Sequence, residues 1–134
     1  MVNFVIQHIP EFTTRQRVNK LLRNGRCMLD EFWTEIRGDN NLAPELDELV
    51  ATLEDVANGK WVPLNQYKKL HVSNKLRFAP FEAKSKHLRL YLFHERETGQ
   101  ILIIDGKKGD QDEDIKRVER IIKEYTMFKQ TQTK

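Results

Sequence analysis

The chain has very little cysteine, and this scarcity excludes several classes of protein. Cys27 is the one cysteine among 134 residues, so neither an internal disulfide framework nor a cysteine-rich zinc site can form. The four histidines do not follow the HExxH spacing of a zinc-binding helix, and no metal or other cofactor is expected. The phosphate loop GxxxxGK[ST] of nucleoside triphosphatases is also absent from the sequence.

Long apolar runs are missing as well. The longest candidates, residues 88–93 and 101–104, are much shorter than the roughly eighteen residues of a membrane-spanning helix. The opening residues MVNFVIQHIPEF carry neither the basic segment nor the small-residue cleavage site of a secretory signal. We therefore expect a soluble, cytoplasmic protein without a membrane partner, folded as a single domain over residues 1–134.

Positive charge is in small excess and is unevenly distributed. The chain has 23 Lys and Arg against 20 Asp and Glu, for a net charge of +3. Residues 1–70 carry nine basic and ten acidic side chains, whereas residues 71–134 carry fourteen basic and ten acidic ones. If the excess clusters in the fold, it will attract phosphate and make binding sensitive to salt. On charge alone, a solvated surface is the favoured interpretation.

Residues 1–70 predict one strand followed by helices. The β-branched segment 2–9 predicts a strand that ends at Pro10. A helix is expected to start at Thr13 or Thr14 and to stop or kink at Gly25. Apolar residues at helical spacing predict two more helical stretches, one over residues 27–37 and one from Pro44 to Gly59. Residues 60–71 have no clean period and are expected to form a loop.

Residues 71–128 predict a three-stranded antiparallel meander followed by a helix. The strands are expected over residues 76–81, 87–95 and 100–105. Short turns join them, which imposes antiparallel pairing. A basic loop, Gly106-Lys107-Lys108-Gly109, then precedes a helix that begins at Asp110 or Asp112. The predicted fold class is therefore α+β, a small antiparallel sheet with helices packed on one face and the other face open.

Alternation along the strand over residues 87–95 groups the side chains that could carry chemistry. We expect His87, Arg89 and Tyr91 on the face opposite the leucines. Basic residues on neighbouring segments would extend this set: Lys75, Arg77, Lys84, Lys86, Lys107 and Lys108. Such a group can bind a phosphate backbone and stack or clamp a base.

RNA cleavage through the 2′-hydroxyl needs a base, an acid and cations that stabilise the charged transition state. His87 titrates near neutral pH and fits the role of base or acid, and Glu82 is another candidate base. Arg89 with the Lys107–Lys108 pair could supply the cations. Taken alone, the pattern is more typical of solvent-facing residues on an exposed strand face, and that simpler interpretation is favoured.

The C-terminal half resembles the RelE/ParE/HigB superfamily of bacterial toxin–antitoxin toxins, most of all its phage-derived HigB-like branch. The resemblance covers about residues 68–125. It rests on an Arg-bearing strand (LRLYLF), a short hairpin, an apolar strand (QILII) and the basic signature DGKK before a helix. It implies a microbial RNase-like toxin fold, metal-independent cleavage of mRNA on the ribosome, and neutralisation by a cognate antitoxin protein.

Carried over by position, Arg89 matches the family's phosphate-binding strand arginine. Lys108 matches a basic residue after the third of these strands, with Lys107 beside it. Two lysines expected on the preceding strand align with Pro80 and Glu82, and a helix tyrosine falls near Asp114. These departures keep an alternative open, namely a catalytically silent or ParE-like binding protein that inhibits gyrase or serves as a protein-interaction module.

Overall fold

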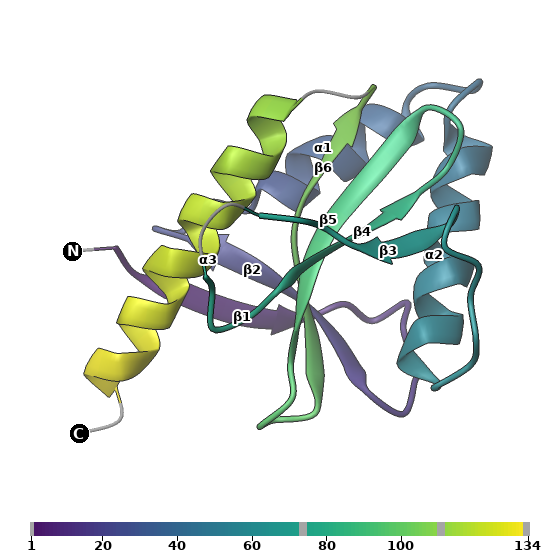
Figure 1. Cartoon of the computed structure of the whole chain (residues 1–134). Coiled ribbons are helices and arrows are strands. Elements are labelled where there is room, and N and C mark those ends of the chain that lie inside the picture. Colours follow the sequence, from purple (N-terminus) through teal and green to yellow (C-terminus); the bar gives the residue numbers. More distant parts are fainter. Residues whose placement is uncertain (1, 73–74, 110–111, 133–134) are drawn as a thin grey trace.

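The structure, a computed structural model, describes residues 2–72, 75–109 and 112–132 and is built on a six-stranded mixed sheet (Figure 1). The strands are β1 (Phe4–His8), β2 (Arg17–Arg23), β3 (Tyr67–Lys69), β4 (Pro80–Lys84), β5 (Leu88–Glu95) and β6 (Gln100–Lys108). The helices are α1 (Met28–Arg37), α2 (Ala43–Ala57) and α3 (Asp112–Gln132). The strand order is β1-β2-β6-β5-β4-β3, and β2 and β6 pair in parallel, whereas the other neighbours are antiparallel. The chain is therefore α+β, as predicted.

Both faces of the sheet are covered, so the prediction of helices on one face is wrong. Leu88, Leu90 and Leu92 of β5 pack in the core beneath α1 and α2. Tyr91 and Phe93 of the same strand pack in a second core beneath α3 (Figure 1). The physical reason lies in β5 and β6 themselves, because strands that are apolar on both sides are buried on both sides.

Residues 17–23 form a strand where a helix was predicted. Val18, Leu21 and Leu22 fit the helical spacing, but the same residues alternate well enough to face both layers of a sheet. β1 pairs with β2 along one edge and β6 pairs with it along the other. Tertiary pairing on both edges therefore outweighs the local helical pattern.

Other boundaries shift by a few residues. β4 occupies residues 80–84 instead of 76–81, and β3 lies within the predicted loop. β6 continues to Lys108, so most of the predicted basic loop is strand. Gly106 permits this path, because a Cβ there would lie 2.3 Å from the ring of Phe32 on α1. The predicted cap Asp110 lies outside the described residues.

The second face is covered jointly by α3 and by the connection between β3 and β4. Leu70 and Phe78 of that connection pack in the same core as Ile122 and Tyr125 of α3. Within the part of the chain that the structure describes, no helix is both long and apolar enough to cross a membrane.

Candidate functional site

Predicted site residues meet at the end of the sheet where the β4–β5 turn lies beside the end of β6. A pocket of about 490 Å³ opens there, which we call the basic pocket. It is lined by Leu42, Ser85, Lys86, His87, Leu88, Arg89, Lys108 and Gly109. Lys86, His87, Arg89 and Lys108, which the sequence predicts as site residues, all line this pocket. The Arg89 side chain, however, faces the other side of the sheet, with Lys107 and Glu82.

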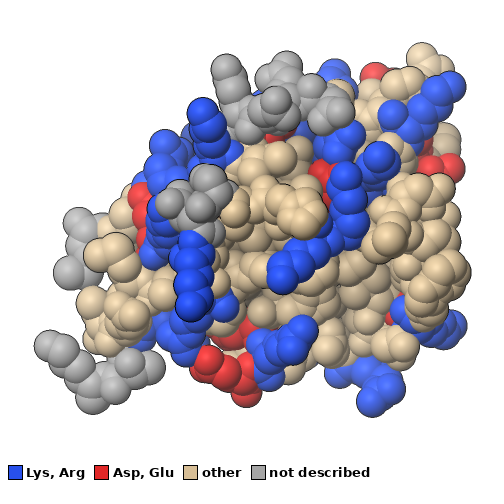
Figure 2. Space-filling view, in the orientation of Figure 1, with Lys and Arg blue, Asp and Glu red and all other residues tan. Residues whose placement is uncertain are grey.

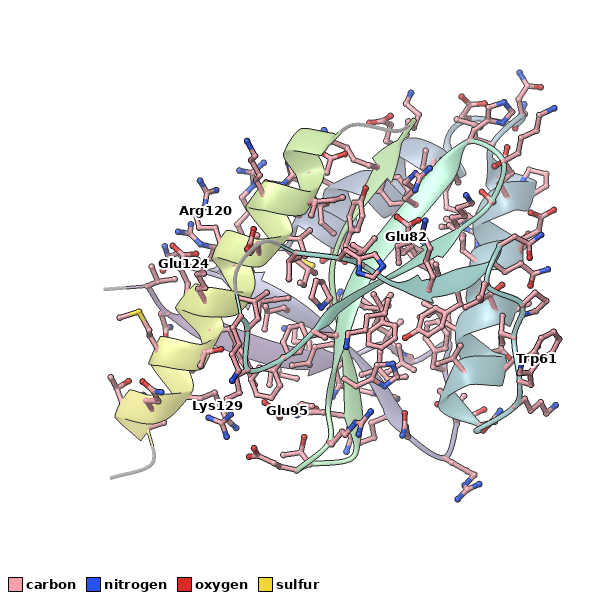
Figure 3. The ribbon with its side chains drawn as sticks, in the orientation of Figure 1. Trp61, Glu82, Glu95, Arg120, Glu124 and Lys129 are labelled. Atoms are coloured by element: carbon pink, nitrogen blue, oxygen red, sulfur yellow. The ribbon has the colours of Figure 1, made fainter. Side chains whose placement is uncertain are left out.

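Arg89 is held in place by a buried carboxylate. Its Nη1 donates to both oxygens of Glu82, over 2.7 and 2.8 Å. The Glu82 side chain, on β4, is 2% exposed (Figure 3). Lys68 of β3 adds a second cation 3.7 Å from the same carboxylate. The guanidinium is therefore fixed in position, and the Glu82 carboxylate matches its charge.

His87 is oriented by Glu45 of α2. The two side chains meet over 2.6 Å between Nδ1 and Oε2, and Glu45 Oε1 accepts from the His87 backbone N–H and from Ser85 Oγ. Burial would raise the pKa of Glu45, but the hydrogen bonds from Ser85 and His87 lower it to about 2. The carboxylate is therefore ionised and favours a proton on His87 Nδ1.

The other ring nitrogen of His87 is available for chemistry. The side chain is 57% exposed, and no residue that the structure describes bonds to Nε2. An imidazole held through Nδ1 by a carboxylate, with Nε2 accessible, has the geometry of a general base. Sequence alternation placed His87 on the face of Arg89, which is wrong, because His87 precedes β5 and turns toward α2.

Lys107 and Lys108 lie on opposite faces of β6, so they do not act as a pair on one face. Lys107 is the cross-strand neighbour of Arg89 and lies 3.8 Å from Asp114 of α3. Lys108 lies opposite Leu88 and 3.0 Å from Glu35 of α1. The separation follows from strand alternation, since these residues extend β6 instead of forming a loop.

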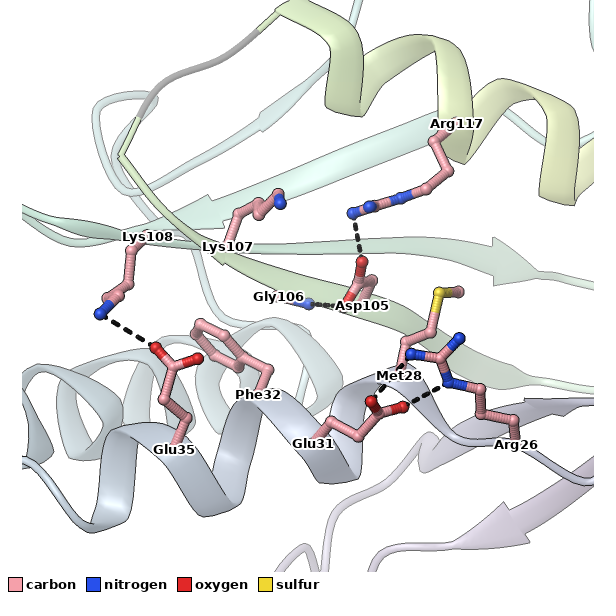
Figure 4. Close-up of a pocket in the computed structure, with 10 residues that line it drawn as sticks. All are labelled: Arg26, Met28, Glu31, Phe32, Glu35, Asp105, Gly106, Lys107, Lys108 and Arg117. Atoms are coloured by element: carbon pink, nitrogen blue, oxygen red, sulfur yellow. Dashed lines mark hydrogen bonds and ion pairs between the residues drawn. The ribbon is translucent and has the colours of Figure 1, made fainter.

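A second pocket, of about 350 Å³, lies along β6 between α1 and α3 (Figure 4). Arg117 of α3 contacts Asp105 there, and Arg26 donates to Glu31 over 2.6 and 2.8 Å. Burial raises the pKa of Asp105, while the nearby Arg117 opposes the rise. Arg26 and Arg117 in this pocket are thus each matched by a carboxylate.

The remaining predicted RNA-binding residues are dispersed. Lys84 is the cross-strand neighbour of Arg89, but Tyr91 is 1% exposed and belongs to the core, so its ring cannot stack on a base. Arg77 lies at the opposite end of the sheet, 2.6 Å from Glu97. Lys75 is exposed on the connection before β4.

Sequence reasoning missed the role of Glu45. Glu45 lies in the first turn of α2, and forty-two positions separate it from His87. No local pattern signals a contact over that separation. Within the described residues, no group of His, Cys, Asp and Glu is arranged to hold a metal ion.

The sequence matches no protein-family model, no curated protein and no solved structure. What the basic pocket can do therefore follows from its own geometry and charge.

Proposed function

We propose that the chain is the toxin of a type II toxin–antitoxin pair, a metal-independent endoribonuclease that cleaves mRNA on the ribosome in the cytoplasm. One observation carries the proposal: a carboxylate-oriented histidine, His87, lines the same pocket as Lys86 and Lys108. This combination offers a proton acceptor beside cations that can neutralise a phosphate.

In the proposed reaction, His87 Nε2 takes the proton of a ribose 2′-hydroxyl. The 2′-oxygen then attacks the adjacent phosphorus, and the bond to the 5′-oxygen breaks, leaving a 2′,3′-cyclic phosphate. The ammonium groups of Lys86 and Lys108 stabilise the negative charge that develops on the phosphate oxygens. The departing 5′-oxygen takes a proton from the ammonium group of Lys86 or Lys108, which line the same pocket.

The order of elements is compatible with the RelE-like fold implied by the sequence resemblance. A strand that pairs in parallel with the last strand is followed by α1 and α2 and then by an antiparallel meander. Arg89 lies on the middle strand of that meander, and Lys107 and Lys108 end its last strand just before α3. β1 and β3 are additions to this arrangement at the two edges of the sheet.

The cations of the basic pocket have carboxylate partners, and these partners compete with a bound RNA phosphate. Arg89 contacts Glu82, His87 contacts Glu45 and Lys108 contacts Glu35. An RNA phosphate must compete with these partners, and we propose that a cognate antitoxin protein covers the pocket and prevents that exchange.

The proposal is tested by induced expression in a bacterial host, with growth and new mRNA 5′ ends as readouts. The wild type should arrest growth and generate new ends, and His87→Gln should reduce cleavage about a hundred-fold or more, as expected when a general base is lost. His71→Gln, which alters an exposed histidine that follows β3 and does not line the basic pocket, should cleave like the wild type. Circular dichroism establishes that each variant is folded.

Two results would contradict the proposal. Folded wild-type protein that causes neither arrest nor cleavage would indicate a catalytically silent binding protein. Arrest with a DNA-damage response but without new RNA ends would indicate a ParE-like gyrase inhibitor.

A further inference from the structure

A further pocket lies at the opposite end of the β4–β5 pair from the basic pocket. It has a volume of about 310 Å³, and we call it the His94 pocket. Its walls come from the end of β3, the start of β4 and the β5–β6 hairpin, and they include Lys69, Arg77, Phe81, His94 and Arg96. The proposed reaction uses none of these residues.

The charge of the His94 pocket is positive and only partly compensated. Arg77 is the cation with a close carboxylate, since it donates to Glu97 over 2.6 Å. Neither Lys69 nor Arg96 forms an ion pair with any residue in the described part of the chain, and both are exposed. This differs from the basic pocket, where Arg89, His87 and Lys108 have carboxylate partners. The His94 pocket therefore attracts an anion without displacing an internal partner.

Uncharged planar rings also lie at the His94 pocket. His94 Nε2 lies 2.5 Å from the hydroxyl of Tyr67, while no described residue bonds to its other ring nitrogen. Burial and the nearby Arg96 lower the pKa of His94, so the ring is neutral at pH 7. The Phe81 ring meets His94 edge-on at 5.0 Å and stacks on Tyr67. Fixed rings of this kind provide an apolar contact and one hydrogen-bonding nitrogen for a nucleobase.

Cations continue between the two pockets. His87 and His94 are seven positions apart, which corresponds to about 23 Å along an extended strand, and both side chains lie on the side of the sheet that faces α1 and α2. The edge strand β3 runs beside this interval and carries Lys68 and Lys69. On the face seen in Figure 2, Lys and Arg gather over α3 and across the middle of the sheet, with few Asp and Glu among them. A single strand of a few nucleotides can follow such a path.

We infer that the His94 pocket is a second RNA subsite, which binds one base and its phosphate a few nucleotides away from the bond cleaved at the basic pocket. The inference rests on the proposed function and adds to it a site that selects for RNA length and base. Single-stranded RNA is favoured over an acidic peptide, because a nucleobase can contact the aromatic rings and the free nitrogen of His94. A peptide carboxylate would use only the cations.

The test measures binding of 2′-O-methyl RNA, which lacks the hydroxyl needed for cleavage, as an octanucleotide and as a dinucleotide. The double variant Lys69→Ala/Arg96→Ala should weaken octanucleotide binding at least about ten-fold more than dinucleotide binding. Its slope of log K against log salt should fall by about 1.4, the value for two lost single-strand phosphate contacts. The matched control Arg15→Ala/Lys60→Ala removes two exposed cations elsewhere and should keep the wild-type slope.

Base recognition is tested on the wild-type protein with octanucleotides that carry one abasic position each. We expect one position, away from the bond that would be cleaved, at which removing the base weakens binding, and we expect this effect to vanish in the double variant. The inference is overturned if the double variant binds the octanucleotide like the wild type, or loses the same factor for both lengths. It is also overturned if an acidic peptide binds the His94 pocket more tightly than the octanucleotide and displaces it. These results would not contradict the proposed function, which is tested by a different comparison. The proposed function is contradicted if the wild type and His87→Gln do not differ in cleavage.

Discussion

At the scale of single residues, Glu45 links α2 to the β4–β5 turn. Its carboxylate accepts hydrogen bonds from Ser85 Oγ and from the His87 backbone N–H, over 2.5 and 2.7 Å, besides contacting the His87 ring. The side chain is 14% exposed, so few water molecules can replace these donors. Loss of the negative charge would therefore loosen the turn that carries the proposed base.

The first prediction concerns the acid stability of this turn. The pKa of Glu45 is lowered from 4.5 to about 2 on folding, because the hydrogen bonds of Ser85 and His87 outweigh the effect of burial. A lowered carboxyl pKa stabilises the fold above pH 4.5, and this contribution is lost as pH falls toward 2. Glu45→Gln should cost about 1–3 kcal/mol at pH 7, and the difference from the wild type should shrink over that interval. Urea unfolding at several pH values measures it.

Glu48→Gln is the matched control for this prediction. Glu48 is exposed on the same helix and forms no ion pair with the described residues. Its stability difference should therefore be small at every pH. A Glu45→Gln difference that stays constant down to pH 2 would contradict the assignment of a low pKa to this carboxyl group.

At the scale of elements, α3 is fastened to the β5–β6 hairpin by a buried carboxylate. Glu95 is fully buried and accepts hydrogen bonds from Tyr125 of α3 over 2.6 Å and from Thr98 and Gln100 over 2.7 Å. Lys129 lies 3.6 Å away on the same helix (Figure 3). Burial alone would raise the pKa of Glu95, but these partners lower it. The attachment therefore depends on complete hydrogen bonding of a buried charge.

The second prediction compares two tyrosine hydroxyls. Tyr125→Phe removes a donor from the buried charge of Glu95 and should destabilise the fold by about 1.5–3 kcal/mol. Tyr67→Phe removes a hydrogen bond to the neutral ring of His94 and should cost about 0.5–1.5 kcal/mol. Each change removes the hydroxyl and keeps the ring, so the packing of the ring is preserved at both positions. Equal losses in urea unfolding would show that the charge of Glu95 does not strengthen its bond to α3.

Also at the scale of elements, the sequence predicts segments with one clear apolar period well. It predicts poorly those whose spacing fits both a helix and a strand. α1, α2, β5 and the antiparallel order of the meander follow from spacing and short turns, and they are confirmed. β2 could not be predicted, because Val18, Leu21 and Leu22 satisfy two periods at once and only pairing with β1 and β6 decides between them.

The candidate site was predictable in part for a similar reason. Arg89, His87 and Lys108 follow from the strand pattern and the family resemblance, and they share a pocket. The contact of Glu45 with His87 joins residues forty-two positions apart, which no local pattern encodes. The separation of Lys107 from Lys108 depended on whether β6 ends at Asp105 or continues, and the close packing of Gly106 on Phe32 favours continuation.

At the scale of the whole molecule, the two cores share their central strands. β5 and β6 contribute leucine and isoleucine side chains to the core under α1 and α2, and Tyr91, Phe93 and Leu102 to the core under α3. Loss of either core would remove the burial that stabilises one side of β5 and β6. We therefore expect the two sides of the sheet to unfold together in one cooperative transition.

The third prediction uses Cys27 to report on that coupling. Cys27 precedes α1 and is 8% exposed, and burial raises the pKa of its thiol, so the folded state should react slowly with a thiol-specific disulfide reagent. Tyr125→Phe lies on the other side of the sheet, yet it should accelerate labelling of Cys27 about ten-fold for each 1.4 kcal/mol of lost stability. Cys27→Ser gives the background rate. If Tyr125→Phe lowers the urea midpoint but leaves the labelling rate of Cys27 unchanged, the side under α1 and α2 stays folded when the α3 side opens, and the shared strands do not couple the two cores.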